Sequence, residues 1–272
     1  MSTQPPTKAV ILARGLGSRM RKEAADVTLD EAQAAAADAG VKAMISVGRP
    51  FLDHVITALA DAGFVDVCLV IGPEHQMIRD YYDAVEKQRV TISYAVQEEP
   101  RGTADALRAA EAFAAGDRVI VINSDNFYPV AALKQFATVP GSALIGFERD
   151  AMLRESNIAA DRISAFALAT ADADGNLAEL VEKPDAATVE RFGDDAVISM
   201  NCWLCGPAIF DAARVIAPSA RGEYEITDAV RRAIADGDPY AVIRSAHGVL
   251  DLSNRGDVAS VAAALGDHEV RL

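Results

Sequence analysis

Short apolar runs that alternate with helix-like stretches constrain the fold of this chain more than any other feature. Three such runs indicate strands with both faces buried, at residues 9–12, 65–71 and 118–122, and a further strand is expected at 141–147. Strands of this kind are typical of parallel sheets that helices cover on both sides. With 272 residues, of which 51% are hydrophobic, the chain is long enough for one α/β domain or two small ones. The pattern therefore predicts an α/β fold.

A glycine loop follows the first of these strands. Residues 12–20 have the sequence Leu-Ala-Arg-Gly-Leu-Gly-Ser-Arg-Met, at the carboxyl end of a strand, where open α/β sheets bind ligands. Gly15 and Gly17 let the backbone approach phosphate oxygens, and Arg19 adds a permanent positive charge. The loop is neither a Walker A sequence nor a complete dinucleotide fingerprint, since no Lys-Ser/Thr pair follows the glycines and Met20 replaces the third glycine. Taken alone, it is equally typical of an ordinary βα turn.

Two more polar turns are expected at the same edge of the sheet. Residues 97–104 follow a strand predicted at 90–96, and Asp125 comes just after the strand at 118–122. Asp251 is a second acid after an apolar pair. Carboxylates in such positions suit Mg²⁺, which prefers oxygen ligands and retains several waters. Taken alone, Asp125 is more typical of a helix cap or a turn.

Charge and composition restrict the partners and the compartment. The net charge of −14 opposes binding to nucleic acid or to an anionic membrane, so phosphate must be bound locally. No apolar run reaches the roughly 20 residues that span a bilayer, and residues 1–8 lack a signal-peptide core, so we expect a cytoplasmic protein. Cys202 and Cys205 have CxxC spacing on a strand predicted at 196–205, where an odd separation places them on opposite faces. This argues against a zinc site or a redox pair.

Other patterns predict the elements between these loops. Thr28 and Glu31 have the spacing of a capping box and Gly40 is typical of a helix C-cap, so a helix is expected at 29–39. Pro50 is expected to begin an amphipathic helix that ends at residue 62. The remaining expectations are helices at 104–115, 207–216 and 257–265, and a hairpin of strands 163–170 and 177–181 around Asp-Gly at 174–175.

In this order, the motifs resemble those of the sugar nucleotidylyltransferases. The resemblance is closest to the glucose-1-phosphate thymidylyltransferase and UTP-glucose-1-phosphate uridylyltransferase type. It extends over nearly the whole chain, through residues 12–20, Lys42, Gln97 with 102–104, 124–126, 182–184, 219–228 and Asp251. The sequence Ser-Ala-Arg-Gly-Glu-Tyr-Glu-Ile-Thr-Asp at 219–228 is the most distinctive of these motifs.

The resemblance implies a fold and a reaction. The fold is a Rossmann-like, mixed and mostly parallel sheet flanked by helices, with a smaller β-rich sugar-binding part. In a single domain, nucleotide binding would fall to about residues 7–147, sugar binding to about 148–255 and a C-terminal helix to about 256–266. The reaction is Mg²⁺-dependent transfer of a nucleotidyl group from dTTP or UTP to a sugar-1-phosphate, a hexose such as glucose-1-phosphate, with release of pyrophosphate.

The resemblance also implies roles for individual residues. The nucleotide would contact Leu12, Ala13, Gly15, Gly17, Ser18, Arg19, Gln97, Gly102 and Thr103. The sugar phosphate would contact Asn126, Glu182, Lys183, Asn201 and Arg221. Asp125 and Asp251 would bind Mg²⁺, and the catalytic set would be Arg19, Lys42, Lys183 and Asp125. No general base is needed, because a sugar phosphate is already ionised at neutral pH and requires alignment and charge neutralisation.

Some residues depart from the family pattern. Arg14 replaces a small residue and would either clash with the nucleotide or contact a phosphate, and Asn201 replaces a frequent glycine. The helix at 29–39 looks like an insertion that would serve as a lid or as a contact in a homo-oligomer, a dimer or a tetramer.

Two other functions are considered. One is a catalytically silent protein of the same fold that binds a nucleotide or nucleotide-sugar and regulates a partner. Retention of both metal ligands, Asp125 and Asp251, favours an enzyme instead. The other is a Rossmann oxidoreductase, which Met20 and the lack of a clear acidic ribose ligand about 20 residues further on disfavour.

Overall fold

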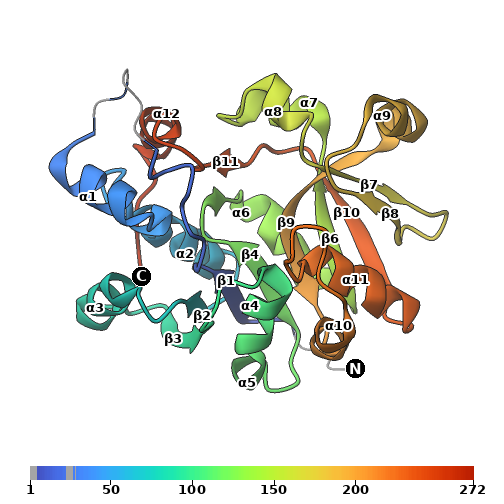
Figure 1. Cartoon of the computed structure of the whole chain (residues 1–272), viewed down its shortest axis with the longest axis horizontal. Coiled ribbons are helices and arrows are strands. Elements are labelled where there is room, and N and C mark those ends of the chain that lie inside the picture. The colour runs from blue at the N-terminus through green and yellow to red at the C-terminus, as the bar shows by residue number, and fades with distance from the viewer. Residues whose placement is uncertain (1–4, 23–26, 28) are drawn as a thin grey trace.

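A central β-sheet runs through the molecule, with helices on both of its faces (Figure 1). The computed structural model describes residues 5–22, 27 and 29–272. The strands on the main path of the sheet are β1 (Lys8–Leu12), β2 (Asp66–Ile71), β3 (Thr91–Val96), β4 (Val119–Asn123), β6 (Ser142–Phe147), β9 (Val197–Cys205) and β10 (Tyr240–Ser245). Their order is β10-β6-β9-β4-β1-β2-β3. Because β9 alone in this order is antiparallel to its neighbours, the sheet is mixed and mostly parallel, as predicted.

β1 illustrates why apolar runs form buried strands here. Ala9 and Ile11 belong to the apolar core on one face of the sheet, Val10 belongs to the core on the other face, and all three are fully buried. Successive side chains of a strand alternate between faces, so an uninterrupted apolar run suits a strand covered on both sides.

The helices divide between these two cores. On the Ile11 side lie α1 (Glu31–Ala39), α2 (Phe51–Asp61), α3 (Gln76–Ala84), α6 (Val130–Lys134), α7 (Arg149–Glu155), α8 (Ala160–Ile163) and α12 (Asp257–Leu265). On the Val10 side lie α4 (Thr103–Ala109), α5 (Glu111–Ala114), α10 (Ala208–Val215) and α11 (Ile226–Ala235). The remaining helical segments are η1 (Lys42–Met44), η2 (Gln135–Thr138), α9 (Ala186–Phe192) and η3 (Gly193–Asp195). Among the described residues, no helix has the length and apolar character needed to cross a bilayer.

Two smaller β elements lie beside the main path. β7 (Ala167–Ala171) and β8 (Leu177–Val181) form the predicted hairpin, which joins the sheet through β9. β5 (Asn126–Phe127) and β11 (Leu250–Asp251) form a two-stranded antiparallel ribbon that places Asn126 opposite Asp251. This ribbon brings two motifs together that are more than a hundred residues apart in the chain.

Three predicted element boundaries were wrong. α1 begins at Glu31, and its capping box joins Asp30 to Gln33, because the Asp30 carboxylate accepts from Gln33 N and the Gln33 side chain accepts from Asp30 N. Thr28, the predicted cap, lies outside the described residues, whereas the predicted cap at Gly40 is confirmed by its left-handed φ of 75°. The helix predicted at 104–115 is interrupted at residue 110 between α4 and α5, and the strand predicted from residue 163 begins at 167, because 160–163 form α8.

The cysteines of the CxxC sequence lie on opposite faces of β9, as predicted. Cys202 packs into the core on the Ile11 side, and Cys205 packs into the core on the Val10 side. Both are free thiols whose pKa is raised by burial, which suits neither metal binding nor redox chemistry.

Candidate active site

A cleft of about 490 Å³ lies at the carboxyl edge of the sheet, where β1, β3 and β4 end. Parallel strands end at a common edge, so turns that are far apart in the sequence converge there. Lys42, Asp125 and Arg221 line the cleft. It is also lined by every residue that the sequence assigns to nucleotide binding, namely Leu12, Ala13, Gly15, Gly17, Ser18, Arg19, Gln97, Gly102 and Thr103.

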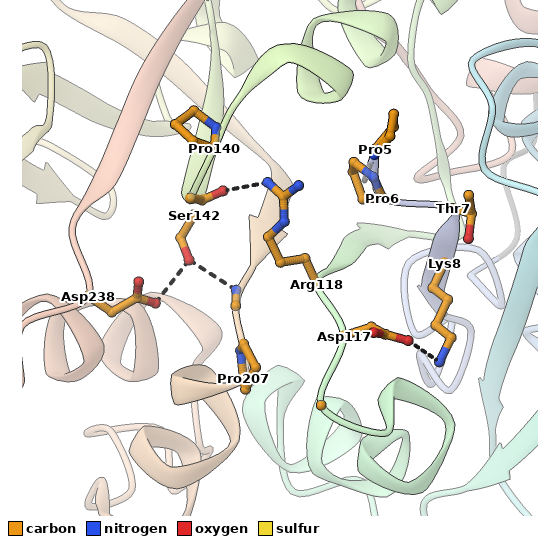
Figure 2. Close-up of a pocket in the computed structure, with 13 residues that line it drawn as sticks. Pro5, Pro6, Thr7, Lys8, Asp117, Arg118, Pro140, Ser142, Pro207 and Asp238 are labelled. Carbon is orange, nitrogen blue, oxygen red and sulfur yellow. Dashed lines mark hydrogen bonds and ion pairs between the residues drawn. The ribbon is translucent and has the colours of Figure 1, made fainter. Parts of the chain in front are cut away.

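A second cavity, of about 370 Å³, lies at the opposite edge, where β1 and β6 begin (Figure 2). Its charged side chains pair within the protein: Lys8 with Asp117 at 2.8 Å, and Asp238 with the hydroxyl of Ser142 at 2.9 Å. Arg118 donates to the carbonyl of residue 141 at 3.3 Å. These groups stabilise the edge of the sheet, so the cleft at the carboxyl edge is the better candidate for chemistry.

The glycine loop meets the end of α1 at close range. Gly17 has a φ of +59°, and a Cβ there would lie 2.2 Å from the carbonyl oxygen of Gly40. Only glycine fits such a backbone conformation and such an approach without strain. Arg19 in the same loop is exposed, and its guanidinium has no partner among the described residues. The positive charge of Arg19 is therefore available to a ligand.

Arg14 does not extend from the loop toward solvent. It is buried, its Nε donates to Gln97 O at 2.6 Å, and its Nη2 donates to Glu98 O at 3.0 Å. A weaker ion pair with Glu74 spans 3.4 Å. Arg14 thus ties the glycine loop to the turn after β3, a role that the sequence did not suggest.

The turn after β3 is held from its other side by the 219–228 motif. Gln97 Nε2 donates to Gly102 O at 3.1 Å and to Asp105 Oδ2 at 2.9 Å, which fixes the side-chain amide of Gln97. Gly102, at φ +108°, packs so closely on Tyr224 that a Cβ would lie 2.5 Å from the Tyr224 carbonyl oxygen. The hydroxyl of Thr103 accepts from the backbone N–H of residue 226 at 2.8 Å. These contacts place Arg221 beside the nucleotide-binding turns.

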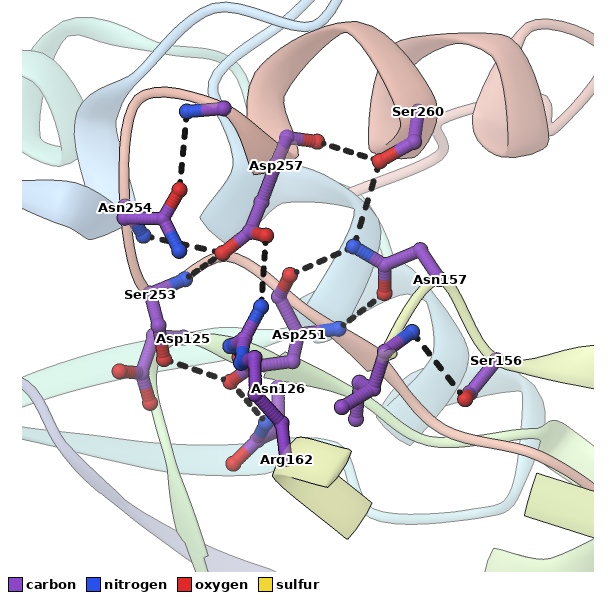
Figure 3. A network of polar contacts seen from close by, with 12 residues as sticks. Asp125, Asn126, Ser156, Asn157, Arg162, Asp251, Ser253, Asn254, Asp257 and Ser260 are labelled. Atoms are coloured by element: carbon purple, nitrogen blue, oxygen red, sulfur yellow. Dashed lines mark hydrogen bonds and ion pairs between the residues drawn. The ribbon is translucent and has the colours of Figure 1, made fainter. Parts of the chain in front are cut away.

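Asp125, which lines the cleft, lies near a second carboxylate, that of Asp251 (Figure 3). Asp125 pairs with Lys42 at 2.9 Å. Asp251 is buried and accepts from the amide of Asn126 at 3.0 Å and from the hydroxyl of Ser253 at 2.9 Å. Burial and the neighbouring Asp125 carboxylate raise the pKa of Asp251 to about 6.

This pair fits a divalent cation by its donor chemistry. Asp125 and Asp251 offer hard oxygen ligands, and their mutual repulsion would be relieved by a cation between them. Among the described residues, no cluster of three or more His, Cys, Asp or Glu side chains could hold a metal by itself. Water and substrate phosphate oxygens would therefore complete the coordination shell of the cation, as is usual for Mg²⁺.

The residues that the sequence assigns to the sugar lie outside the lining of the cleft, except for Arg221. Glu182 and Lys183 follow β8, and desolvation together with the neighbouring carboxylate of Glu225 raises the pKa of Glu182. Arg221 pairs with the same Glu225 at 2.6 Å. Because Glu225 and Arg221 both shift the pKa of Glu182, the 182–184 motif lies beside the 219–228 motif. The amide of Asn126, which is expected to contact the sugar, donates to Asp251 in this structure, and the sugar contact stays a prediction.

Two of these residues have an unusual backbone conformation. Lys183 has a φ of +47° and Asn201 a φ of +55°, both in the left-handed region that non-glycine residues rarely adopt. Glycine is favoured in this region, and asparagine tolerates it better than most other residues do. This explains why asparagine can replace, at position 201, the glycine that the family often has. Backbone strain of this kind concentrates at functional sites.

Comparisons with known proteins cover most of the chain. A family model described as "Nucleotidyl transferase" matches residues 8–262. The UTP-glucose-1-phosphate uridylyltransferase AglF of Haloferax volcanii is 28% identical over 242 residues, which are 87% of this chain and 87% of that protein. A glucose-1-phosphate thymidylyltransferase of Streptomyces antibioticus is 29% identical over 234 residues and 85% of this chain, which spans 58% of that protein's length. A UDP-glucose pyrophosphorylase solved with UDP-glucose shares the fold at 18% identity, with a TM-score of 0.73 over 97% of this chain and 100% of its own.

Proposed function

The chain belongs to the nucleotidyl transferase family, as its motifs suggested, and from this premise we propose that it joins a nucleotidyl group to a sugar-1-phosphate. The donor is UTP or dTTP, the acceptor is a hexose phosphate such as glucose-1-phosphate, and pyrophosphate is released. The convergence of the glycine loop, Lys42, the 97–103 turn, Asp125 and Arg221 on one cleft is the observation that carries this proposal. The named activities of the uridylyltransferase and thymidylyltransferase relatives support the choice of substrates.

Within this proposal, the residues act through charge and alignment. The acceptor oxygen of a sugar phosphate is ionised at neutral pH, so no side chain must remove a proton. Arg19 and the backbone of the glycine loop bind the triphosphate, and Lys42 neutralises charge near the reacting phosphate. Asp125 and Asp251 would hold Mg²⁺, which when bound supplies further positive charge to the phosphoryl oxygens.

Gln97 and Gly102 are assigned to the nucleobase. The two hydrogen bonds donated by Gln97 Nε2 leave its side-chain oxygen as an acceptor, which matches the N3–H donor of uracil and thymine. Uracil and thymine differ by a methyl group, so both remain candidate bases. Residues 7–147 would form the nucleotide-binding part and residues 148–255 the sugar-binding part of a single domain, with a C-terminal helix at about 256–266.

The decisive experiment measures pyrophosphate release with five nucleoside triphosphates and several sugar-1-phosphates, with and without Mg²⁺. We expect Mg²⁺-dependent turnover with a pyrimidine triphosphate. Absence of turnover with every pair would reject the enzyme. If the protein then still bound a nucleotide or nucleotide-sugar, the catalytically silent alternative would be supported.

A further inference from the structure

A partly buried ion pair links Asp251 to an arginine outside all of the family motifs (Figure 3). Arg162 extends from α8, and its Nη2 donates to Asp251 Oδ2 at 2.5 Å. Its Nη1 donates to Asp257 Oδ1 at 2.9 Å. One guanidinium therefore bridges two carboxylates, one of which belongs to the proposed metal pair.

Arg162 contacts Oδ2 of Asp251, which is the oxygen that accepts no hydrogen bond from Asn126 or Ser253. Asp251 Oδ1 already accepts from Asn126 Nδ2 at 3.0 Å and from Ser253 Oγ at 2.9 Å. A carboxylate oxygen has two lone pairs, so these donors occupy Oδ1. A metal ion must then approach Oδ2, where it meets the guanidinium of Arg162.

The Asp251 carboxylate is restrained by the two bonds to its Oδ1 and by the fixed main chain that carries it. Asn157 accepts from Asp251 N at 2.8 Å and donates to Asp251 O at 2.9 Å, which fixes the main chain of Asp251 on both sides. The Asp251 side chain is 5% exposed, whereas the Arg162 side chain is 30% exposed. The arginine is therefore the mobile member of the pair.

Asp257 provides an alternative partner for the displaced guanidinium. It binds a different nitrogen of Arg162, and its other oxygen is occupied by the backbone N–H groups of Ser253 and Asn254 at 2.9 and 3.0 Å. If Nη2 leaves Asp251, the bond between Nη1 and Asp257 can persist. Release of Asp251 to a cation then leaves no buried charge without a partner.

We propose that Arg162 is the resident counter-ion of Asp251, which a divalent cation displaces from Oδ2, and that it thereby lowers the affinity of the site for metal. The inference rests on the proposed function, since it takes Asp125 and Asp251 as the metal-binding pair. Arg162 is a positioning residue and touches neither substrate in this scheme. Metal affinity follows the net charge and the rigidity of the ligand set, and Arg162 changes both.

The test is Mn²⁺ binding to the full chain without nucleotide, measured from the free-ion signal in electron paramagnetic resonance. Arg162→Gln should bind Mn²⁺ on the order of tenfold more tightly than the wild type, because a positive charge beside a dication is removed. Arg162→Lys keeps the charge and should stay near the wild-type affinity. Arg154→Gln is the matched control, because Arg154 is an exposed arginine of α7 that contacts neither acid, and it should change nothing.

Equal or weaker Mn²⁺ binding in Arg162→Gln would overturn the proposal, and so would failure of every variant to bind Mn²⁺. If Arg162→Gln does not fold, Arg162→Met retains the aliphatic stem and carries the same expectation. Asp251→Asn should abolish the tight site in either background. Because no substrate is present, these results are independent of turnover, so an inactive protein with the expected Mn²⁺ affinities would count against the proposed function alone.

Discussion

Arg14 offers a direct test of how the nucleotide cleft is held together. Its buried guanidinium donates to Gln97 O at 2.6 Å and to Glu98 O at 3.0 Å, so one side chain fixes the main chain where β3 ends. Arg14→Met keeps an unbranched stem in the same space and removes both donors. Hydrogen bonds from a charged donor contribute about 1.5–3 kcal/mol each, so the sum of the two is the upper limit of the unfolding free energy that the substitution can remove.

The expected net loss is roughly 2–4 kcal/mol of unfolding free energy. It is smaller than the sum of both bonds because Nη1 of Arg14 is buried and has no partner among the described residues, and the substitution removes this unfavourable group as well. Arg14 fixes the main chain of Gln97, the residue assigned to the nucleobase. The Michaelis constant for the nucleoside triphosphate should therefore rise about tenfold, while kcat changes less.

Urea unfolding and pyrophosphate-release kinetics at varied triphosphate concentration measure these two effects. Arg101→Met is the matched control, since Arg101 lies on the same turn but is exposed and pairs with Glu99 at the surface. An unfolding free energy within about 0.5 kcal/mol of the wild type, together with an unchanged Michaelis constant, would refute the assigned role of Arg14.

Other substitutions test the remaining parts of the structure. Burial lowers the pKa of His54 to about 4, so between about pH 6.5 and pH 4 His54 is protonated in the unfolded chain but neutral in the folded chain. Between pH 7 and pH 5 the wild type should therefore lose about 1–2 kcal/mol more unfolding free energy than His54→Gln. Equal losses in urea titrations would contradict this. Gly17→Ala should weaken triphosphate binding more than tenfold in calorimetry, because its Cβ would meet Gly40. Gly141→Ala is the control, because Gly141 lies at the opposite edge of the sheet and its Cβ would meet nothing within 4 Å, so it should have little effect. Asp125→Asn should abolish metal-stimulated pyrophosphate release while circular dichroism shows an intact fold, and wild-type rates would show that the metal binds elsewhere.

The parts of the fold that depend on local sequence could be predicted. The apolar run at 9–12 forms β1 within one residue, and the final helix matches its prediction at 257–265, because alternation and periodicity act over a few neighbours. The start of α1 was misplaced because Thr28 and Asp30 are both good caps, and only the folded chain selects between neighbouring candidates. Convergence of the 12–20 and 97–104 turns was predictable because the carboxyl ends of parallel strands share one edge.

Contacts that depend on distant parts of the chain left no signal in the sequence. Arg162 lies in an unremarkable stretch, and its pairing with Asp251 depends on how α8 packs beside β11. The hydrogen bond from the amide of Asn126 to Asp251 depends on the register of the β5-β11 ribbon, which the sequence did not predict, and the sugar contact assigned to Asn126 stays a prediction. Arg14 was noted as unusual, yet its partners lie 83 and 84 residues away in the sequence.

Ion pairing within the protein reconciles a net charge of −14 with the anionic substrates proposed for the cleft. Three acids near the cleft each have a cation of their own: Lys42 pairs with Asp125, Arg162 with Asp251 and Arg221 with Glu225. Arg19 and Lys183 differ from these cations, because both are exposed and have no partner among the described residues. Under the proposed function, a substrate phosphate would bind them without breaking an existing ion pair, whereas a paired cation would first have to leave its carboxylate. The sequence alone does not tell these two groups of cations apart, and only the folded chain separates the cations that pair with its own acids from those left without a partner.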